Sequence, residues 1–240
     1  QHNLKLIQES TVPLEDQRRV SVLSNRGIPI QWVSGNADKA AASFFKINTQ
    51  GTPLDQIEEL LLKNRKKPHA IAARAVIRAG RGHRYWSSFT AERASEIERV
   101  AQVLHSALFE PELNSPVKTL DLPLAGARGV RNALQTLIDL FLLVSKTQQT
   151  LACSIDDFDN DIDGSATIAL LTRTSSLIRR VTGNDGGSLG LHPAVYFYGP
   201  TGVHSGPMLM GTLTLIQQKL SNNDKEFFKK FTSARGRLEQ

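Results

Sequence analysis

The chain has little cysteine and no long apolar run, and each of these absences excludes a class of protein. Cys153 is the single cysteine among 240 residues, which excludes a disulfide framework and a cysteine-rich zinc site. The longest strongly apolar patch, residues 137–144, is far shorter than the roughly 20 residues that cross a bilayer. Hydrophobic residues at 40% and charged residues at 22% are typical of a globular protein. We therefore expect a cytoplasmic protein with no membrane partner.

One stretch of the chain lacks acidic residues altogether. Between residues 60 and 90 there is no aspartate or glutamate, although the net charge of the whole chain is only +6. The basic residues of this stretch are Lys63, Arg65, Lys66, Lys67, Arg74, Arg78, Arg81 and Arg84. Clustered positive charge is typical of proteins that bind a polyanion. We predict that these residues contact DNA; the alternative is a solvated helix end and a solvated helix stripe.

Aromatic residues follow the arginines of this basic segment at once. Tyr85, Trp86 and Phe89 come directly after Arg84. Basic side chains beside exposed aromatic rings suit contacts with single-stranded nucleic acid or with a flipped base. The alternative is that the rings belong to the hydrophobic core.

Periodicity and turn residues predict an α+β fold. Apolar spacings of three and four indicate helices, and short β-branched or aromatic runs indicate strands. The predicted strands are 19–23, 28–33 and 194–198. The predicted helices are 3–10, 37–45, 53–64, 69–79, 91–109, 129–145, 165–180, 208–220 and 224–232. The pattern indicates the C-terminal part of a small α/β domain over residues 1–65, followed by a mainly α-helical domain over residues 66–240.

A polar turn at residues 48–52 precedes one of these helices. Thr52 is a suitable N-cap, Pro53 suits the first helical position, and Asp55 would lie in the first turn. The free backbone N–H groups at a helix N-terminus often bind phosphate. From the residues alone, a phosphate site and a merely well-capped helix are both open.

The segment around this turn resembles a sequence box of the ParB/sulfiredoxin-like family, with the rough pattern E-N-x-Q-R-x-x-L-N-P-x-E-E. The residues that fit are Asn48, Gln50, Leu54, Ile57, Glu58 and Glu59. The segment is closer still to relatives that carry a D-G-Q-H-R box and tend to read F-x-K-I-N-T-x-x-T-P-L here. Gln1 and His2 resemble the second half of that box, with Asn3 in place of its final arginine, so we expect the chain to be a fragment that begins inside the box.

The resemblance implies a partial ParB-like domain that binds a nucleoside triphosphate with Mg, in a bacterial DNA-modification or anti-phage defence system. Other components of that system would be partners, and ATP hydrolysis and oligomerisation stay open. The implied phosphate-binding residues are Gln1, His2, Asn48, Thr49, Gln50 and Thr52. Ile47 and Gly51 replace a metal-holding glutamate and an arginine of the family pattern. These two positions favour an alternative function, a non-catalytic adaptor that binds DNA or a partner.

An acidic loop matches the first half of a calcium-binding loop. Asp159, Asp161 and Asp163 precede Gly164 in the pattern D-x-D-x-D-G. The twelfth position, which needs a bidentate glutamate, is Leu170. We therefore predict no metal site here, and a loop that caps the helix beginning near Ser165.

Two further patterns are weak. Residues 199–206 lie where a P-loop would, but His204, Ser205 and Gly206 replace its Gly, Lys and Ser or Thr. Side chains of the kinds found in nuclease sites occur at His192, His204 and Asp185. Their spacing matches neither H-N-H nor H-E-x-x-H, so we expect the histidines to be structural. Catalytic residues stay unknown.

Overall fold

The computed structural model describes residues 55–110, 130–146, 154–193 and 195–238, together with residues 32, 34, 35, 39, 40 and 43. The chain divides into two units, Gln1–Pro53 and Leu54–Gln240. In the first unit, the predicted helix 3–10 and strand 19–23 lie wholly outside the described residues. Of the predicted strand 28–33, residue 32 is described and is not in a strand; of the predicted helix 37–45, residues 39, 40 and 43 are described and are helical.

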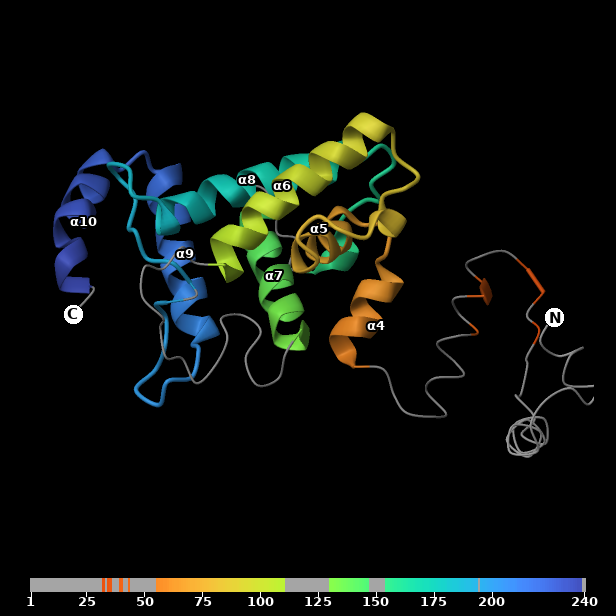
Figure 1. The fold of residues 1–240 in the computed structure, drawn as a ribbon, viewed down its shortest axis with the longest axis horizontal. Helices are drawn as coiled ribbons and strands as arrows, with labels where there is room; N and C mark the ends of the chain where they lie inside the picture. Colours follow the sequence, from red (N-terminus) through yellow and green to blue (C-terminus); the bar gives the residue numbers. More distant parts are fainter. Residues whose placement is uncertain are drawn as a thin grey trace, which may run out of the picture. The chain divides into compact units, whose positions relative to one another are not determined.

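The described part of the second unit is built from helices (Figure 1). They are α4 (Gln56–Lys63), α5 (Pro68–Ile77), α6 (Ala91–Phe109), α7 (Val130–Ser145), α8 (Ser165–Thr182), α9 (Gly206–Ser221) and α10 (Lys225–Leu238). Two short 3-10 turns, η1 (His83–Tyr85) and η2 (Ile155–Asp157), lie between them. The helices predicted for this part of the chain are confirmed, with shifted ends. None of the described helices is long and apolar enough to cross a membrane.

Helix α5 is the buried centre of the unit. It packs against α6, α7 and α8, and nearly all of its residues are buried. Ala70, Ala72, Ala73 and Ala75 let the neighbouring helices approach closely, because alanine adds only a methyl group to the helix surface. Arg74 and Ile77 are half-buried. A mostly apolar central helix therefore carries one guanidinium group at the boundary of the core.

Helices α6 and α8 run side by side across the unit (Figure 1), and α9 packs on α7 and α8. The apolar face predicted for α6 is confirmed, because Ile97, Val100, Ala101, Leu104 and Leu108 are all buried. Spacings of three and four residues place these side chains on one face of the helix.

The predicted α+β fold is wrong for the described residues, which contain helices and a single isolated bridge, between Tyr198 and His204. The strand predicted at 194–198 is a turn in which the amides of Val195 and Tyr196 both donate to the carbonyl of His192. Phe197 has a φ of 68° and is buried. Phe197 belongs to the helical core, and pairing of this run with a neighbour is limited to the bridge at Tyr198.

Helix α4 also differs from its prediction. We expected it to begin at Pro53 with Thr52 as the N-cap, but it begins at Gln56. Asp55 is the N-cap, and its carboxylate accepts the backbone N–H of Ile57 at 2.9 Å. Ile57 and Leu61 are buried, and α4 packs against α7. The helix that was assigned to an α/β domain is therefore part of the helical core.

Candidate nucleic-acid interface

The first half of the basic segment faces an acidic turn that lies far away in the sequence. The ammonium group of Lys63 lies 3.5 Å from the carboxylate of Asp156 in η2. Lys67 donates from its ammonium group to the backbone carbonyls of Asp156 and Phe158. The side chains of these two predicted DNA contacts therefore have partners within the protein itself.

The acidic loop beyond η2 is held by its own hydrogen bonds. The buried carboxylate of Asp161 accepts from the backbone N–H of Gly164 at 2.9 Å and from that of Thr167 at 2.8 Å. Asp163 accepts from the hydroxyl of Ser165 at 2.6 Å and from its N–H at 3.0 Å, and these hydrogen bonds keep the pKa of Asp163 below its usual value. The capping role predicted for the loop is confirmed. In the described ranges, no three His, Cys, Asp or Glu side chains gather as a metal site would require.

This loop is also fastened to the basic segment. The N–H of Asp161 donates to the carbonyl of Lys66 at 2.8 Å, while the side chain of Lys66 is exposed. Gly164 has a φ of 85°, and a Cβ there would lie 2.9 Å from the ring of Phe89. The loop therefore sits tightly against the lysine end of the segment.

The second half of the segment is organised around an aromatic ring. The guanidinium carbon of Arg74 lies 4.3 Å from the ring centre of Tyr85, and that of Arg78 lies 5.3 Å from it. These distances are those of cation–π contacts. One turn of helix α5 and the following turn η1 thus hold two guanidinium groups over one ring.

The charge of Arg74 is poorly compensated. Burial of its guanidinium lowers its pKa, Tyr85 opposes that shift, and the positive charges of Arg78 and Arg65 add to it. Its Nη1 is buried and has no hydrogen-bond partner among the described residues. A buried donor without a partner is unusual in a folded protein. The described residues therefore leave the positive charge of Arg74 without a compensating carboxylate.

Two further predicted contacts, Arg81 and Arg84, are exposed, and Arg84 directly precedes Tyr85 in the chain. Within the described residues, none of the arginines around Tyr85 and η1 is paired with a carboxylate. We name this group the arginine surface; its members are Arg74, Arg78, Arg81 and Arg84. Arg65 lies close enough to Arg74 to lower its pKa, but it has interactions of its own.

The aromatic residues of the segment divide between surface and core. Tyr85 is half-buried and lies with the arginines, whereas Trp86 is fully buried and donates from its Nε1 to Glu98 at 2.9 Å. Phe89 packs against the loop at Gly164. The prediction of an exposed aromatic row for base stacking is therefore wrong for Trp86, because its ring is needed in the core.

Among the described residues, one histidine lies within hydrogen-bond distance of a serine hydroxyl, as a base and a nucleophile would. His69 Nε2 lies 2.9 Å from Ser145 Oγ, and its ring lies 4.1 Å from that of Phe158, centre to centre. Burial lowers the pKa of His69 to about 4, with further lowering by the charges of Arg173 and Lys67. Only 1% of His69 is exposed, and its Nδ1 has no partner among the described residues. The pair therefore belongs to the core.

His192 and His204 also have structural contacts. His192 contacts the carbonyl of Ser106 at 3.2 Å, and burial lowers its pKa. The ring of His204 packs edge-on against Tyr198, while Asp185 pairs with Arg179 at 3.0 Å. The structure therefore engages the three residues with different partners and does not build a nuclease site from them.

The residues predicted to bind phosphate lie outside the described residues. They are Gln1, His2, Asn48, Thr49, Gln50 and Thr52. Their role, and the binding of a nucleoside triphosphate with Mg, stay predictions.

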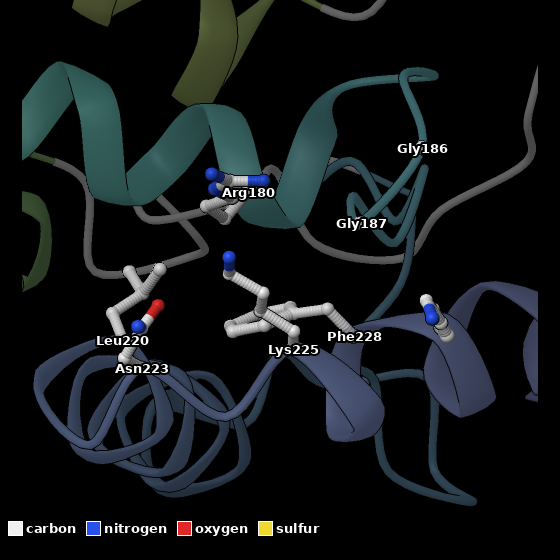
Figure 2. A pocket seen from close by; sticks show the side chains of 8 residues that line it. Arg180, Gly186, Gly187, Leu220, Asn223, Lys225 and Phe228 are labelled. Atoms are coloured by element: carbon white, nitrogen blue, oxygen red, sulfur yellow. The ribbon is translucent and has the colours of Figure 1, made fainter.

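The fold also forms a basic site that the sequence does not reveal, at the C-terminal end of α8. Arg180, Lys225 and Lys229 line one pocket with Phe228 (Figure 2). The sequence gives only a weak signal, because Arg180 and Lys225 are 45 positions apart and each has an acidic residue nearby in the sequence, Asp185 or Glu226. Only the fold brings them together.

No protein-family model, curated protein or solved structure matches this chain. The family resemblance of residues 1–60 therefore stays a prediction.

Proposed function

We propose that the helical unit binds DNA through the arginine surface. The observation that carries the proposal is the pair Arg74 and Arg78 over Tyr85, with no carboxylate partner for either guanidinium among the described residues. Like charges repel when they are held this close, and a bound phosphate would offset that repulsion.

The contrast with the neighbouring lysines supports the proposal. Lys63 and Lys67 have partners in η2, whereas the arginine surface has no carboxylate partner in the described ranges. Arginine also suits this role, because its planar guanidinium can give two parallel hydrogen bonds to a phosphate. The cations of the arginine surface thus have the geometry that suits a phosphate and no carboxylate partner among the described residues.

Such contacts position a protein on the backbone and do not read bases. Since Trp86 is buried, the described surface offers no row of rings for unpaired bases. The proposed partner is therefore the phosphate backbone of duplex DNA. A place in a DNA-modification or anti-phage defence system, with nucleotide binding by residues before 54, remains a proposal that depends on the family resemblance. A DNA-binding adaptor without nucleotide chemistry is the alternative; titration of ATP and CTP distinguishes the two.

The test is fluorescence anisotropy with a labelled 20-base-pair duplex at low salt. The parent chain should bind, and the triple variant Arg78→Ala, Arg81→Ala, Arg84→Ala should bind more weakly by about 1 kcal/mol or more, since it loses three exposed phosphate contacts. The control is Arg99→Ala, because Arg99 is exposed but paired with Glu96 at 2.7 Å. If the parent chain does not bind duplex, or if the triple variant binds as the parent does, the proposed function is wrong.

A further inference from the structure

A pocket of about 570 Å³ lies between the end of α8, the loop after it and the start of α10. This volume falls within the usual range for small-molecule sites. Arg180 comes from α8, Gly186 and Gly187 from the loop, and Lys225 and Phe228 from α10. Figure 2 shows the ammonium group of Lys225 reaching across the pocket toward the guanidinium of Arg180. Two cations thus face each other across the hollow.

The nearby carboxylates are occupied elsewhere. Asp185 pairs with Arg179 at 3.0 Å, and Asp224 pairs with Lys219 at 2.9 Å. Glu226 pairs with Lys229 at 3.1 Å, so Lys229 at the pocket edge is already compensated. In the described part of the chain, neither Arg180 nor Lys225 has a carboxylate partner. The pocket therefore has a net positive charge that its own surroundings do not neutralise.

The loop is held in place and leaves the hollow open. The N–H of Leu189 donates to the carbonyl of Arg180 at 2.9 Å, and that of Leu191 donates to the carbonyl of Val181 at 2.8 Å. These bonds fasten the loop to the last turn of α8. Gly187 has a φ of 85°, and a Cβ there would lie 3.1 Å from Arg180 Nη1. Glycine thus lets the loop pass beside the guanidinium without filling the space around it.

The rest of the lining is apolar. Phe228 lies under the guanidinium of Arg180, with 5.5 Å from the guanidinium carbon to the ring centre. Leu220 lines this pocket and also a second hollow of about 370 Å³, which shares Arg180 and extends to Arg173. A ligand with an anionic end and an apolar or aromatic body would match both parts of the lining.

We propose that this pocket binds a small organic phosphate, with its phosphate between Arg180 and Lys225 and its apolar body against Phe228 and Leu220. The site is separate from the arginine surface, and the proposal does not rest on DNA binding. A phosphate monoester has two sources, a free small molecule or the 5′ end of a strand, and we commit to the small molecule.

The probe is phenyl phosphate, titrated calorimetrically into the parent chain beside inorganic phosphate and phenol. Phenyl phosphate should bind more tightly than either part alone, since only it satisfies the cations and the apolar lining together. Arg180→Gln and Lys225→Ala should each weaken it about 10- to 100-fold, the loss expected for a charge-assisted hydrogen bond. The matched controls are Arg179→Gln and Lys230→Ala, which change the same residue types on the same helices outside the pocket lining.

Lys225→Ala keeps the test valid if Arg180→Gln unfolds the chain, because Lys225 is exposed. Absence of phenyl phosphate binding to the parent overturns the proposal, and so does equal weakening by the control variants. A decamer of thymidine with a 5′-phosphate is the second arm. If it binds through Arg180 while phenyl phosphate does not, the site takes a strand end and the small-molecule proposal is wrong. Loss of duplex binding by the arginine-surface variant leaves the pocket result unaffected, so the two proposals fail separately.

Discussion

The lysine half and the arginine half of the basic segment have the same kind of charge, but the fold treats them differently. Lys63 and Lys67 meet the acidic turn η2, more than 85 residues away in the sequence. Arg74 and Arg78 meet Tyr85 and each other. A run of basic residues without local acids is therefore not one binding surface. The cations available to a polyanion are those that the rest of the chain leaves without a partner.

The largest loss of stability is expected from removing the hydrogen bonds that hold the acidic loop beside the lysine half. Asp161→Ala removes the acceptor for Gly164, for the Thr167 amide and for the Thr167 hydroxyl, which lies 2.5 Å away. Because these donors are buried, the free energy of unfolding should fall by about 3 kcal/mol or more. Urea denaturation measures it, with Asp159→Ala, an exposed residue of the same loop, as the control. Equal stability of the two variants would refute the capping role.

A similar effect is expected from acid, through the histidine between the two halves. The pKa of His69 is about 4 in the folded chain, below its ordinary 6.5. The unfolded chain therefore takes up this proton first, and stability is fully present above pH 6.5 and is lost as the pH falls toward 4. The expected loss is about 3 kcal/mol.

Urea denaturation at a series of pH values, with the parent and His69→Gln, checks this expectation. Glutamine does not titrate, so the variant should lose less stability between pH 6.5 and 4 than the parent does. Some slope should remain, because burial also lowers the pKa of His192. Parallel curves for the two proteins would rule out His69 as the main source.

A smaller effect should follow from releasing one lysine. Asp156→Asn removes the carboxylate 3.5 Å from Lys63, so Lys63 becomes available to phosphate. The slope of log K against log salt for duplex binding should steepen by up to about 0.9 units. Asp185→Asn makes the same charge change beside Arg179 and is the matched control. If both variants change the slope equally, only the net charge matters and the contrast between the two halves is lost.

The smallest effect is expected from calcium. The oxygens of Asp161 and Asp163 already accept hydrogen bonds from the chain, so millimolar calcium should leave the melting temperature unchanged. A calorimetric scan measures it. A stabilisation above about 1 kcal/mol, as a ligand gives at several times its dissociation constant, would mean that the loop exchanges its caps for a metal.

Local patterns could predict much of the helical unit. The spacing of apolar residues on α6 was sufficient to place its buried face, and the aspartates before Ser165 were sufficient to predict a capping loop. Partners across the sequence could not be predicted in this way. The residues near Lys63 in the sequence do not predict its contact with Asp156. Those near Trp86 do not predict that its ring is buried and hydrogen-bonded to Glu98.

The misplaced strand has a related cause. The run at 194–198 has the composition of a strand, but strand pairing depends on a neighbour that periodicity alone does not reveal. The start of α4 was placed too early because Thr52 and Pro53 form a good cap locally, whereas Asp55 provides the observed one. The pocket at Arg180 could not be predicted either, because its lining residues are far apart in the sequence and come together only in the folded chain.

The most direct test of the central claim compares salt dependence in the two halves. Duplex affinity is measured from about 50 to 200 mM salt for the parent, for the triple variant Arg78→Ala, Arg81→Ala, Arg84→Ala, and for the double variant Lys63→Ala, Lys67→Ala. The arginine variant should flatten the slope of log K against log salt by up to about 2.7 units, while the lysine variant should leave it nearly unchanged. An unchanged slope for the arginine variant, or an equal loss per residue for the lysine variant, would contradict the account.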